Sequence, residues 1–124
     1  MSLLAPLSVA PMIDWSNTHF RYLMRLIAPH SLLYTEMQTI GAVMNNPKKA
    51  LNYHPCEHPI ALQLGGADPK LLSLCAKIAE DYGFDEINLN FGCPSDRVQA
   101  GHFGACLMAE QELAAECITQ IKKN

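Results

Sequence analysis

Four apolar segments that favour β-strands recur along the chain at nearly even intervals. They end near Met12, Glu36, Leu64 and Asn90, and each is followed by a stretch long enough for a helix. Strands that alternate with helices pair in parallel, because each helix carries the chain back across the sheet before the next strand begins. The sequence therefore predicts four strand–helix units of an α/β fold.

Capping and breaking residues set the limits of the predicted elements. The clearest helix has Asp68 as its N-cap, Pro69 at its first position and Gly83 just beyond its end. An earlier helix is capped by Ser16 or Asn17. The predicted strands are Leu7–Met12, Leu32–Glu36, Ile60–Leu64 and Glu86–Phe91, and a last helix covers Gln111–Lys123.

Helical periodicity predicts which face of each helix is buried. The three expected apolar stripes are Phe20, Leu23, Met24 and Ile27; Leu71, Cys75, Ile78 and Tyr82; and Leu113, Cys117, Ile118 and Ile121. The stretch from Gly41 to His58 is predicted to be irregular, with a break at Asn45-Asn46-Pro47, and a glycine-rich loop is expected through Gly101 and Gly104.

Chain length limits the choice among parallel α/β folds. No Gly-x-Gly-x-x-Gly opens a helix, which disfavours a Rossmann domain. A (β/α)8 TIM barrel fits the strand rhythm but needs about 250 residues, so the 124 residues present supply half of one, about four βα units. Four parallel strands leave two edges unpaired. We therefore expect residues 1–124 to be a partial barrel domain of a longer protein, or to associate through the exposed strand edges.

Composition excludes several classes of protein. With 49% hydrophobic and 17% charged residues, the chain is globular rather than disordered. A net charge of −3 gives no overall electrostatic case for nucleic acid, although a local basic patch is compatible with it. Five scattered cysteines without a signal peptide indicate free thiols and a cytoplasmic location. No apolar run reaches the roughly 18 residues needed to span a membrane.

The segment from Asn88 to Ser95 carries the strongest chemical signal. Asn88 and Asn90 alternate with apolar residues on the predicted strand, and Gly92 and Pro94 then end the strand around Cys93. In a barrel, catalytic groups lie at the carboxyl ends of the strands. A thiol in that position can donate a proton, attack an electrophile or bind a metal.

Two carboxamides are predicted to point inward at the same end of neighbouring strands. Gln63 shares a strand face with the small Ala61, and Asn90 shares one with Asn88. Because a carboxamide offers donors and an acceptor in one plane, this pair suits the edge of a flavin or a pyrimidine. The alternative is that the two amides only bridge neighbouring backbones. The turn Ala10-Pro11-Met12-Ile13 and Glu36 lie at strand ends as well.

The other cysteines and the histidines favour structural roles. Cys75 and Cys117 fall in apolar helical stripes and are expected to be buried, and Cys106 is expected to be packed. His54, Cys56 and His58 lack a second ligand pair in a recognised spacing, so no metal is predicted. Arg97, after the strand end, either contacts a phosphate or forms a surface ion pair.

Several stretches taken together resemble a known family. They are Ser8-Val9-Ala10-Pro11-Met12, Leu33-Tyr34-Thr35-Glu36-Met37, Ala61-Leu62-Gln63-Leu64-Gly65-Gly66, Asp85-Glu86-Ile87-Asn88-Leu89-Asn90 continuing through Cys93-Pro94-Ser95-Asp96-Arg97-Val98-Gln99, and Phe103-Gly104-Ala105-Cys106-Leu107-Met108. In this order they resemble the N-terminal half of the catalytic barrel of bacterial tRNA-dihydrouridine synthases, closest to the A-type subfamily.

The resemblance implies a flavin-binding (β/α)8 barrel followed by a helical tRNA-binding domain. It implies FMN reduced by NADPH, and reduction of a uridine to 5,6-dihydrouridine in the D-loop of tRNA. Carried over by motif, Cys93 is the proton donor, Gln63 hydrogen-bonds the flavin, and Asn90 holds the target nucleotide. Ala10, Pro11, Met12 and Ile13 line the flavin, and Arg97 is a candidate contact to tRNA.

The chain departs from the family pattern by lacking the second half of the barrel. The strand-five Lys-x-Arg region, a later histidine, the glycine-rich phosphate sites and the helical domain are missing, so we expect these residues alone to bind FMN poorly and to be inactive. Two alternatives stay open. One is another pyrimidine-reducing flavin barrel, such as a dihydroorotate or dihydropyrimidine dehydrogenase, which Asp96-Arg97-Val98-Gln99 disfavours. The other is a non-enzymatic (βα)4 module that associates through its edges.

Overall fold

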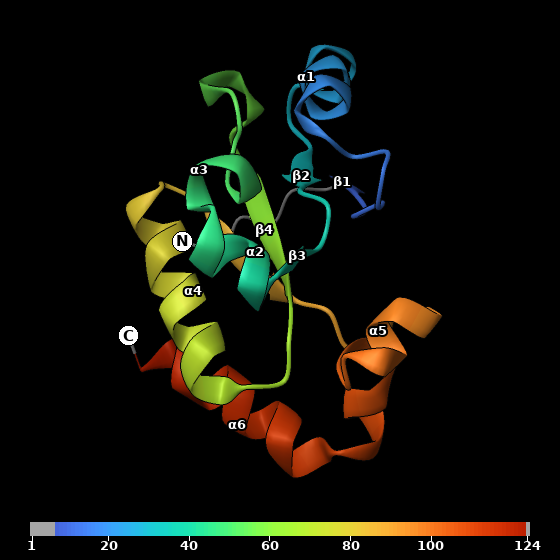
Figure 1. Ribbon diagram of the computed structural model, residues 1–124. Helices are drawn as coiled ribbons and strands as arrows, with labels where there is room; N and C mark the ends of the chain where they lie inside the picture. The colour runs from blue at the N-terminus through green and yellow to red at the C-terminus, as the bar shows by residue number, and fades with distance from the viewer. Residues whose placement is uncertain (1–6, 124) are drawn as a thin grey trace.

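The computed structural model describes residues 7–123. It consists of a parallel β-sheet with helices packed against it (Figure 1). The strands are β1 (Ser8–Val9), β2 (Leu32–Tyr34), β3 (Gln38–Thr39), β4 (Ile60–Gly65) and β5 (Glu86–Leu89). The α-helices are α1 (Thr18–Ile27), α2 (Ile40–Asn45), α3 (Pro47–Ala50), α4 (Pro69–Asp81), α5 (Asp96–Ala100) and α6 (Gln111–Lys122), and the 3-10 helices are η1 (Pro55–Glu57) and η2 (Gly104–Ala109).

Strand β4 lies at the centre of the sheet and pairs in parallel on both sides. On one side β2 pairs its first half, with Tyr34 opposite Ala61, and β3 pairs its last residues, with Gln38 opposite Leu64. On the other side β5 pairs it along most of its length, and β1 pairs β2. Since β2 and β3 are two halves of one interrupted strand, four strand positions result, which confirms the α/β prediction.

The main core lies between the outer face of the sheet and helices α2, α4 and α6. Every residue of β4 is buried, as expected for a central parallel strand covered on both faces. Leu62 and Leu64 from this strand pack with buried residues of the helices, among them Val43, Leu72 and Cys117. The alternate residues of β4, including Gln63, face the opposite side, which is the inner face of a barrel.

Helix α4 begins and ends where its sequence signals predict. The Asp68 carboxylate accepts a hydrogen bond from the Leu71 N–H at 2.9 Å, Pro69 opens the helix, and Gly83 has the positive φ of 88° that favours glycine. The predicted buried face was partly wrong, since Leu71 and Tyr82 are exposed. Leu72, Cys75, Ala76 and Ala79 are buried instead.

Small residues explain how α4 is rotated. Helices α4 and α6 lie side by side (Figure 1), and the Ser73 hydroxyl of α4 donates to the Gln120 carbonyl of α6 at 2.9 Å. Alanine and serine on this face let the two helices approach closely, which moves the larger Leu71 and Tyr82 outward. On α6, Cys117 is buried and Leu113 and Ile121 pack partly against the core as predicted, whereas Ile118 is exposed, contrary to prediction.

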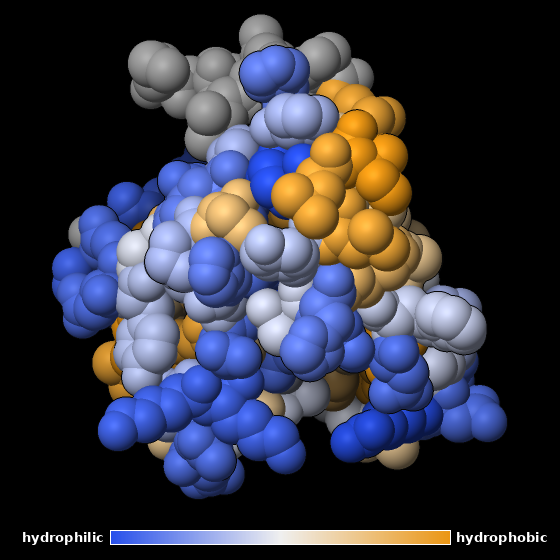
Figure 2. Space-filling view, turned by 90° about the horizontal axis from the view of Figure 1, so that it is seen from above, coloured by the Kyte–Doolittle hydropathy of each residue, from blue (hydrophilic) through white to orange (hydrophobic). Residues whose placement is uncertain are grey.

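Helix α1 contradicts its predicted burial most strongly. Asn17 caps it by accepting from the Phe20 N–H at 3.0 Å. However, Leu23 and Ile27 of the expected apolar stripe are 53% and 66% exposed. Figure 2 shows the resulting hydrophobic patch on the face over this helix. The residues that α1 buries are Arg21 and Arg25.

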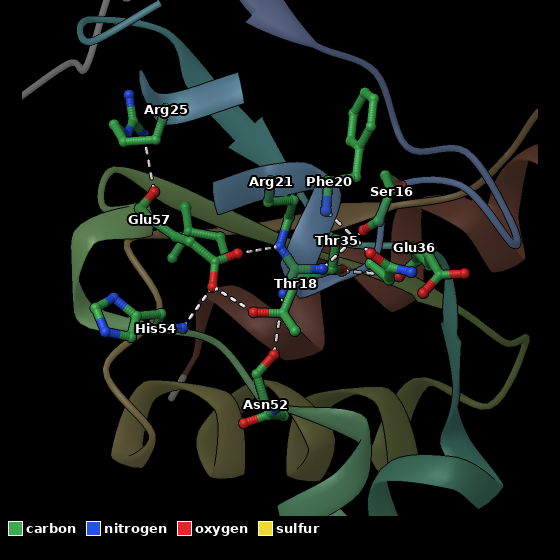
Figure 3. Close-up of polar contacts among 12 residues, drawn as sticks. Ser16, Thr18, Phe20, Arg21, Arg25, Thr35, Glu36, Asn52, His54 and Glu57 are labelled. Atoms are coloured by element: carbon green, nitrogen blue, oxygen red, sulfur yellow. Dashed lines mark hydrogen bonds and ion pairs between the residues drawn. The ribbon is translucent and has the colours of Figure 1, made fainter. Parts of the chain in front are cut away.

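A carboxylate and several backbone carbonyls account for the inward arginines (Figure 3). Arg21 Nε lies 2.5 Å from Glu57 Oε1, and the two residues are only 4% and 0% exposed. The Thr18 hydroxyl donates to Glu57 Oε2 at 2.9 Å. Arg25 donates to the carbonyls of Ser31 at 2.7 Å, Glu57 at 2.8 Å and Pro59 at 3.1 Å. These bonds hold α1 to η1 and to the start of β4.

The stretch from Gly41 to His58 is more regular than predicted, because short helices fill it. Asn46 separates α2 from α3 as a helix cap, accepting from the Lys49 N–H at 3.2 Å, and Pro47 opens α3. The predicted break is therefore real, but helical turns flank it. Strands β1, β2 and β5 are shorter than predicted, and the predicted glycine-rich loop contains α5 and η2. Within residues 7–123, no helix has the length and apolar character needed to cross a membrane.

Removing one member of the buried Arg21–Glu57 pair should strongly destabilise the chain. We expect Arg21→Met to lower the free energy of unfolding by about 3–5 kcal/mol, because it leaves the Glu57 carboxylate buried without its cation. Urea unfolding followed by far-UV circular dichroism measures this loss. The double variant Arg21→Met/Glu57→Leu should lose less than the single one. The exposed Lys77–Glu80 pair, broken by Lys77→Met, is the matched control; equal losses from Arg21→Met and Lys77→Met would contradict the prediction.

Candidate active site at the carboxyl edge of the sheet

Three carboxamides form a connected chain on the inner face of the sheet: Gln63 of β4, Asn88 of β5, and Asn90 just beyond the end of β5. Gln63 and Asn88 are opposite each other in the strand register, and Gln63 Nε2 donates to Asn88 Oδ1 at 2.7 Å. Asn90 Nδ2 donates to Gln63 Oε1 at 3.0 Å. Gln63 is only 9% exposed. The structure thus brings Gln63 and Asn90 together at one end of the sheet, and Asn88, which the sequence reading left without a role, joins them.

The Asn90 side chain also binds the loop that carries Cys93. Its Oδ1 accepts from the Gly92 N–H at 3.2 Å and from the Cys93 N–H at 2.9 Å. The Asn90 N–H donates to the Leu64 carbonyl at 2.9 Å, which continues the β4–β5 pairing beyond the last strand residue. Asn90 therefore connects the buried Gln63 to the backbone of the thiol-bearing residue. Asn90 thus bonds backbone N–H groups of its own loop as well as Gln63, while Gln63 bonds other side chains.

The Cys93 thiol differs from the helical thiols in exposure and acidity. It is partly exposed, and its Sγ lies 3.4 Å from the Ser95 hydroxyl oxygen. The thiol donates in this bond when protonated, and the hydroxyl donates once the thiol has ionised. This hydroxyl first, and the Ser95 backbone N–H second, lower the pKa of Cys93. Burial raises the pKa of Cys75 and Cys117, which are fully buried as predicted.

Helix η2 supports the Cys93 loop from behind. The Ala105 N–H donates to the Cys93 carbonyl at 3.0 Å. Gly104 has a φ of +62°, and a Cβ on it would lie 2.7 Å from the Cys93 carbonyl oxygen and 2.4 Å from Val98 Cγ1. Only glycine meets both the conformation and the close approach at this position. Cys106 follows in η2 and is half-buried, consistent with the expected packing.

The turn after β1 is held by Ser16 and Glu36. Met12 N–H donates to the Ser16 hydroxyl oxygen at 2.8 Å, and this hydroxyl donates back to the Met12 carbonyl at 3.0 Å. Glu36 Oε1 accepts from the Asp14 N–H at 2.7 Å, and Asp14 has a φ of 65°, which aspartate tolerates better than most residues. Ser16, considered only as a helix cap, and Glu36 thus shape the turn.

The residues of that turn lie at the carboxyl end of β1. Ala10, Met12 and Ile13 are exposed there, and Pro11 is half-buried. The predicted flavin-lining residues are therefore on the same edge of the parallel sheet as Gln63 and Asn90, with Met12 and Ile13 presenting apolar side chains.

Arg97 lies exposed on α5, two residues beyond Ser95. None of the ion pairs found within residues 7–123 involves it. The surface ion pair, one of the two roles considered for Arg97, is not formed within residues 7–123.

The histidines around Pro55 have partners other than a metal. His54 Nδ1 accepts from the Cys56 N–H at 3.2 Å, and His58 Nδ1 lies 2.7 Å from Asp85 Oδ2. In the described residues, 7–123, there is no group of three His, Cys, Asp or Glu side chains arranged to hold a metal ion.

A tyrosine–glutamate pair below the amides was missed by the sequence reading. Tyr34 OH donates to Glu86 Oε1 at 3.1 Å, and both residues are paired with Ala61 in the strand register. Burial, followed by the Glu86 charge, raises the pKa of Tyr34. The sequence does place Glu86 on the same strand face as Asn88, because the two are two residues apart. That Tyr34 of β2 is its partner depends on the strand register, which the sequence does not show.

Comparison with known proteins identifies the family. A model of the dihydrouridine synthase (Dus) family matches residues 8–124. The chain belongs to the dihydrouridine synthase family. This confirms the resemblance seen in the sequence and decides against the dihydroorotate and dihydropyrimidine dehydrogenase alternatives.

Curated relatives in this family are closely similar over nearly the whole chain. The tRNA-dihydrouridine(20/20a) synthase of Synechocystis sp. (strain ATCC 27184 / PCC 6803 / Kazusa) is 56% identical over 123 residues, which cover 98% of this chain and 37% of the relative. The protein of the same name from Shewanella oneidensis is 57% identical over 116 residues, 94% of this chain and 35% of the relative. The protein of the same name from Escherichia coli (strain K12) is 56% identical over 115 residues, which cover 93% of this chain and 33% of the relative.

The chain thus spans about a third of the length of these relatives. With its parallel sheet and four strand positions, it fits the N-terminal part of the family's (β/α)8 barrel.

A methyl group at Gly104 should loosen the Cys93 loop. We expect Gly104→Ala to destabilise the chain by about 1–3 kcal/mol, because the added Cβ meets backbone and Val98 in a conformation that favours glycine. Amide hydrogen exchange followed by mass spectrometry should show faster exchange of the Ala105 N–H. Gly92→Ala is the matched control, since a Cβ there has nothing within 4 Å. The prediction is wrong if both variants exchange like the parent.

Proposed function

We propose that this chain provides the proton donor and the ring-reading amides of an enzyme that reduces uridine to 5,6-dihydrouridine in tRNA. The observation that carries the proposal is the bonded chain from Gln63 through Asn90 to the Cys93 loop at the carboxyl edge of the sheet. The names of the relatives specify 20/20a, so we propose uridines 20 and 20a of the D-loop as targets.

The residues present fit a flavin. A flavin ring presents hydrogen-bond donors and acceptors along one edge, and the Gln63 amide offers both from a buried position. Met12 and Ile13 add exposed apolar side chains on the same edge of the sheet. We propose that Ala10, Pro11, Met12, Ile13 and Gln63 hold FMN. When bound, FMN supplies hydride obtained from NADPH for carbon 6 of the uracil.

Cys93 supplies the proton that completes the reduction. Its S–H bond breaks as a C–H bond forms at carbon 5 of the uracil, and the thiolate that remains accepts a hydrogen bond from Ser95. A lowered pKa makes the thiol a stronger acid, provided that it stays protonated at the working pH. Because Cys93 is partly exposed, water can return the proton.

Asn90 and Arg97 are the proposed contacts to tRNA. The uracil has to leave its stack to reach the site, as in other enzymes that act on a base. Asn90 retains a second N–H beyond the one that Gln63 accepts, and this donor can bind an acceptor on the uracil edge. Arg97, exposed on α5, can bind a backbone phosphate and so position the loop without reading its sequence.

The surrounding protein is proposed by analogy with the family. We propose that residues 1–124 form the first part of the catalytic barrel, and that the rest of the barrel and a helical tRNA-binding domain complete the enzyme. Much of the contact with tRNA would then lie outside these residues, in keeping with their net charge of −3. Free thiols at all five cysteines are consistent with a cytoplasmic location.

A chimera tests the proposed role of Cys93. Residues 8–124 replace the matching segment of the Escherichia coli (strain K12) relative, and the purified chimera is checked for bound FMN by absorbance. We expect it to form dihydrouridine in tRNA, measured by mass spectrometry of the nucleosides. Cys93→Ala should lower the rate about 10²–10⁴-fold, the usual contribution of a general acid.

The control for this chimera is the variant Cys106→Ala. It removes a thiol that lies in η2, the helix that contacts the Cys93 loop. It should retain the parent rate. A Cys93→Ala chimera that holds FMN and modifies tRNA at the parent rate would remove the proposed function.

Association through strand edges is a second candidate property. Strands β1 and β5 each pair with one neighbour in the described sheet, and the exposed apolar residues of α1 lie close to β1 in the sequence. A hollow of about 340 Å³ beside β5 is lined mostly by apolar residues, including Ile87, Leu89 and Ile118, together with the polar Asn88 and Lys122. These features favour contacts with another protein surface, whether a second copy or further barrel segments.

We expect residues 1–124 alone to bind FMN poorly and to be inactive, because they present one side of the proposed flavin site. Titration of the purified chain with FMN, followed by flavin fluorescence, should show no stoichiometric tight binding. Light scattering on the same sample reports whether the edges drive association. Tight binding of one FMN per chain, with dihydrouridine formation, would refute this expectation.

A further inference from the structure

Ser95 occupies the N-cap position of α5, yet its side chain makes no capping bond to that helix. Serine is among the best N-cap residues because its oxygen can accept a backbone N–H of the first turn. Asn17, Thr39, Asn46 and Asp68 all cap their helices in this way. The Ser95 hydroxyl instead lies 3.4 Å from Cys93 Sγ.

The backbone on both sides of this contact is held by other bonds. The Cys93 N–H is bound by Asn90, and its carbonyl by the Ala105 N–H. The Pro94 carbonyl accepts from Gln99 Nε2 at 2.6 Å, and the Ser95 carbonyl accepts from the Gln99 N–H at 2.9 Å. These bonds hold the backbone from Cys93 to Ser95 in place. The Ser95 hydroxyl and the Cys93 thiol therefore face each other, and neither side chain is needed to hold the loop.

We propose that Ser95 is a positioning residue, which holds the Cys93 sulfur in place and stabilises the thiolate that remains after the proton has been donated. The proposal rests on the proposed role of Cys93 as proton donor. When the thiol gives its proton to carbon 5, the sulfur keeps the electron pair of the broken S–H bond. The Ser95 O–H then donates to that sulfur, and proton return from water restores the thiol.

The same contact between Ser95 and Cys93 bears on the acidity of the thiol. The Ser95 side chain is the largest influence on the thiol, and it lowers the pKa of Cys93. A lowered pKa means that the thiolate forms at lower pH than in an ordinary cysteine. Removing the hydroxyl must therefore raise the pKa of Cys93 and shift thiolate formation to higher pH.

Alkylation of the thiol measures this effect on the chain as it stands. Only the thiolate reacts with iodoacetamide, so the rate at Cys93, followed by peptide mass spectrometry across a pH series, reports its ionisation. Ser95→Ala should move the profile to higher pH and slow alkylation at neutral pH by about threefold to tenfold, the effect of losing one hydrogen bond of ordinary strength at a partly exposed sulfur. Ser95→Thr, which keeps the hydroxyl, should restore the parent profile.

Two comparisons make the outcome decisive. Cys106 in the same samples should keep its profile, because a change there as well would indicate a general loosening of the loop rather than loss of one hydrogen bond. Identical Cys93 profiles for the parent and Ser95→Ala would overturn the proposal. The alkylation result does not depend on tRNA modification, so it can fail while the Cys93→Ala chimera supports the proposed function, and the reverse also holds.

Discussion

The buried ion pair between Arg21 and Glu57 fixes the first helix to the rest of the structure. Helix α1 turns much of its apolar side outward, so apolar burial contributes little to holding it. Helix α1 is held instead by polar bonds. Arg21 binds the Glu57 carboxylate, and Arg21 and Arg25 donate to backbone carbonyls, including that of Glu57 shortly before β4. Burying both charges is costly, but an isolated buried charge costs more, so the pair confines α1 to one position. That position in turn sets the turn after β1.

The parallel sheet then determines where chemistry can gather. Because all strands run in one direction, the turn after β1, the Gln63 end of β4 and the loop after β5 meet at one edge. The two-residue period of the strands aligns Gln63 with Asn88, and Asn90 extends the amides toward the thiol. Gln63 and Asn88 are therefore positioned by strand pairing rather than by the conformation of a loop.

The thiol is prepared by its immediate neighbours rather than by a charged group. Cys93 has amide support from Asn90 at its own N–H, a glycine-dependent contact with η2 at its carbonyl, and a hydroxyl beside its sulfur. Asn90 and Ser95 lie close to Cys93 in the chain, whereas η2 follows later, after α5. The surroundings of the Cys93 thiol are therefore organised inside these 124 residues, whereas the proposed pocket for a flavin and a base would need more than the sheet described.

The sequence by itself determined the features that depend on chain neighbours. The strand–helix rhythm, the caps of α4, the break at Asn46 and the position of Cys93 at a strand end follow from local steric and hydrogen-bond preferences, and the structure reproduces them. Motifs in their order also identified the family. Tertiary structure alone decided the inward turn of Arg21, the Tyr34–Glu86 pair and the Ser95 contact to the thiol. Those depend on which groups face one another across the fold, and a buried carboxylate or a strand register leaves no periodic trace in the sequence.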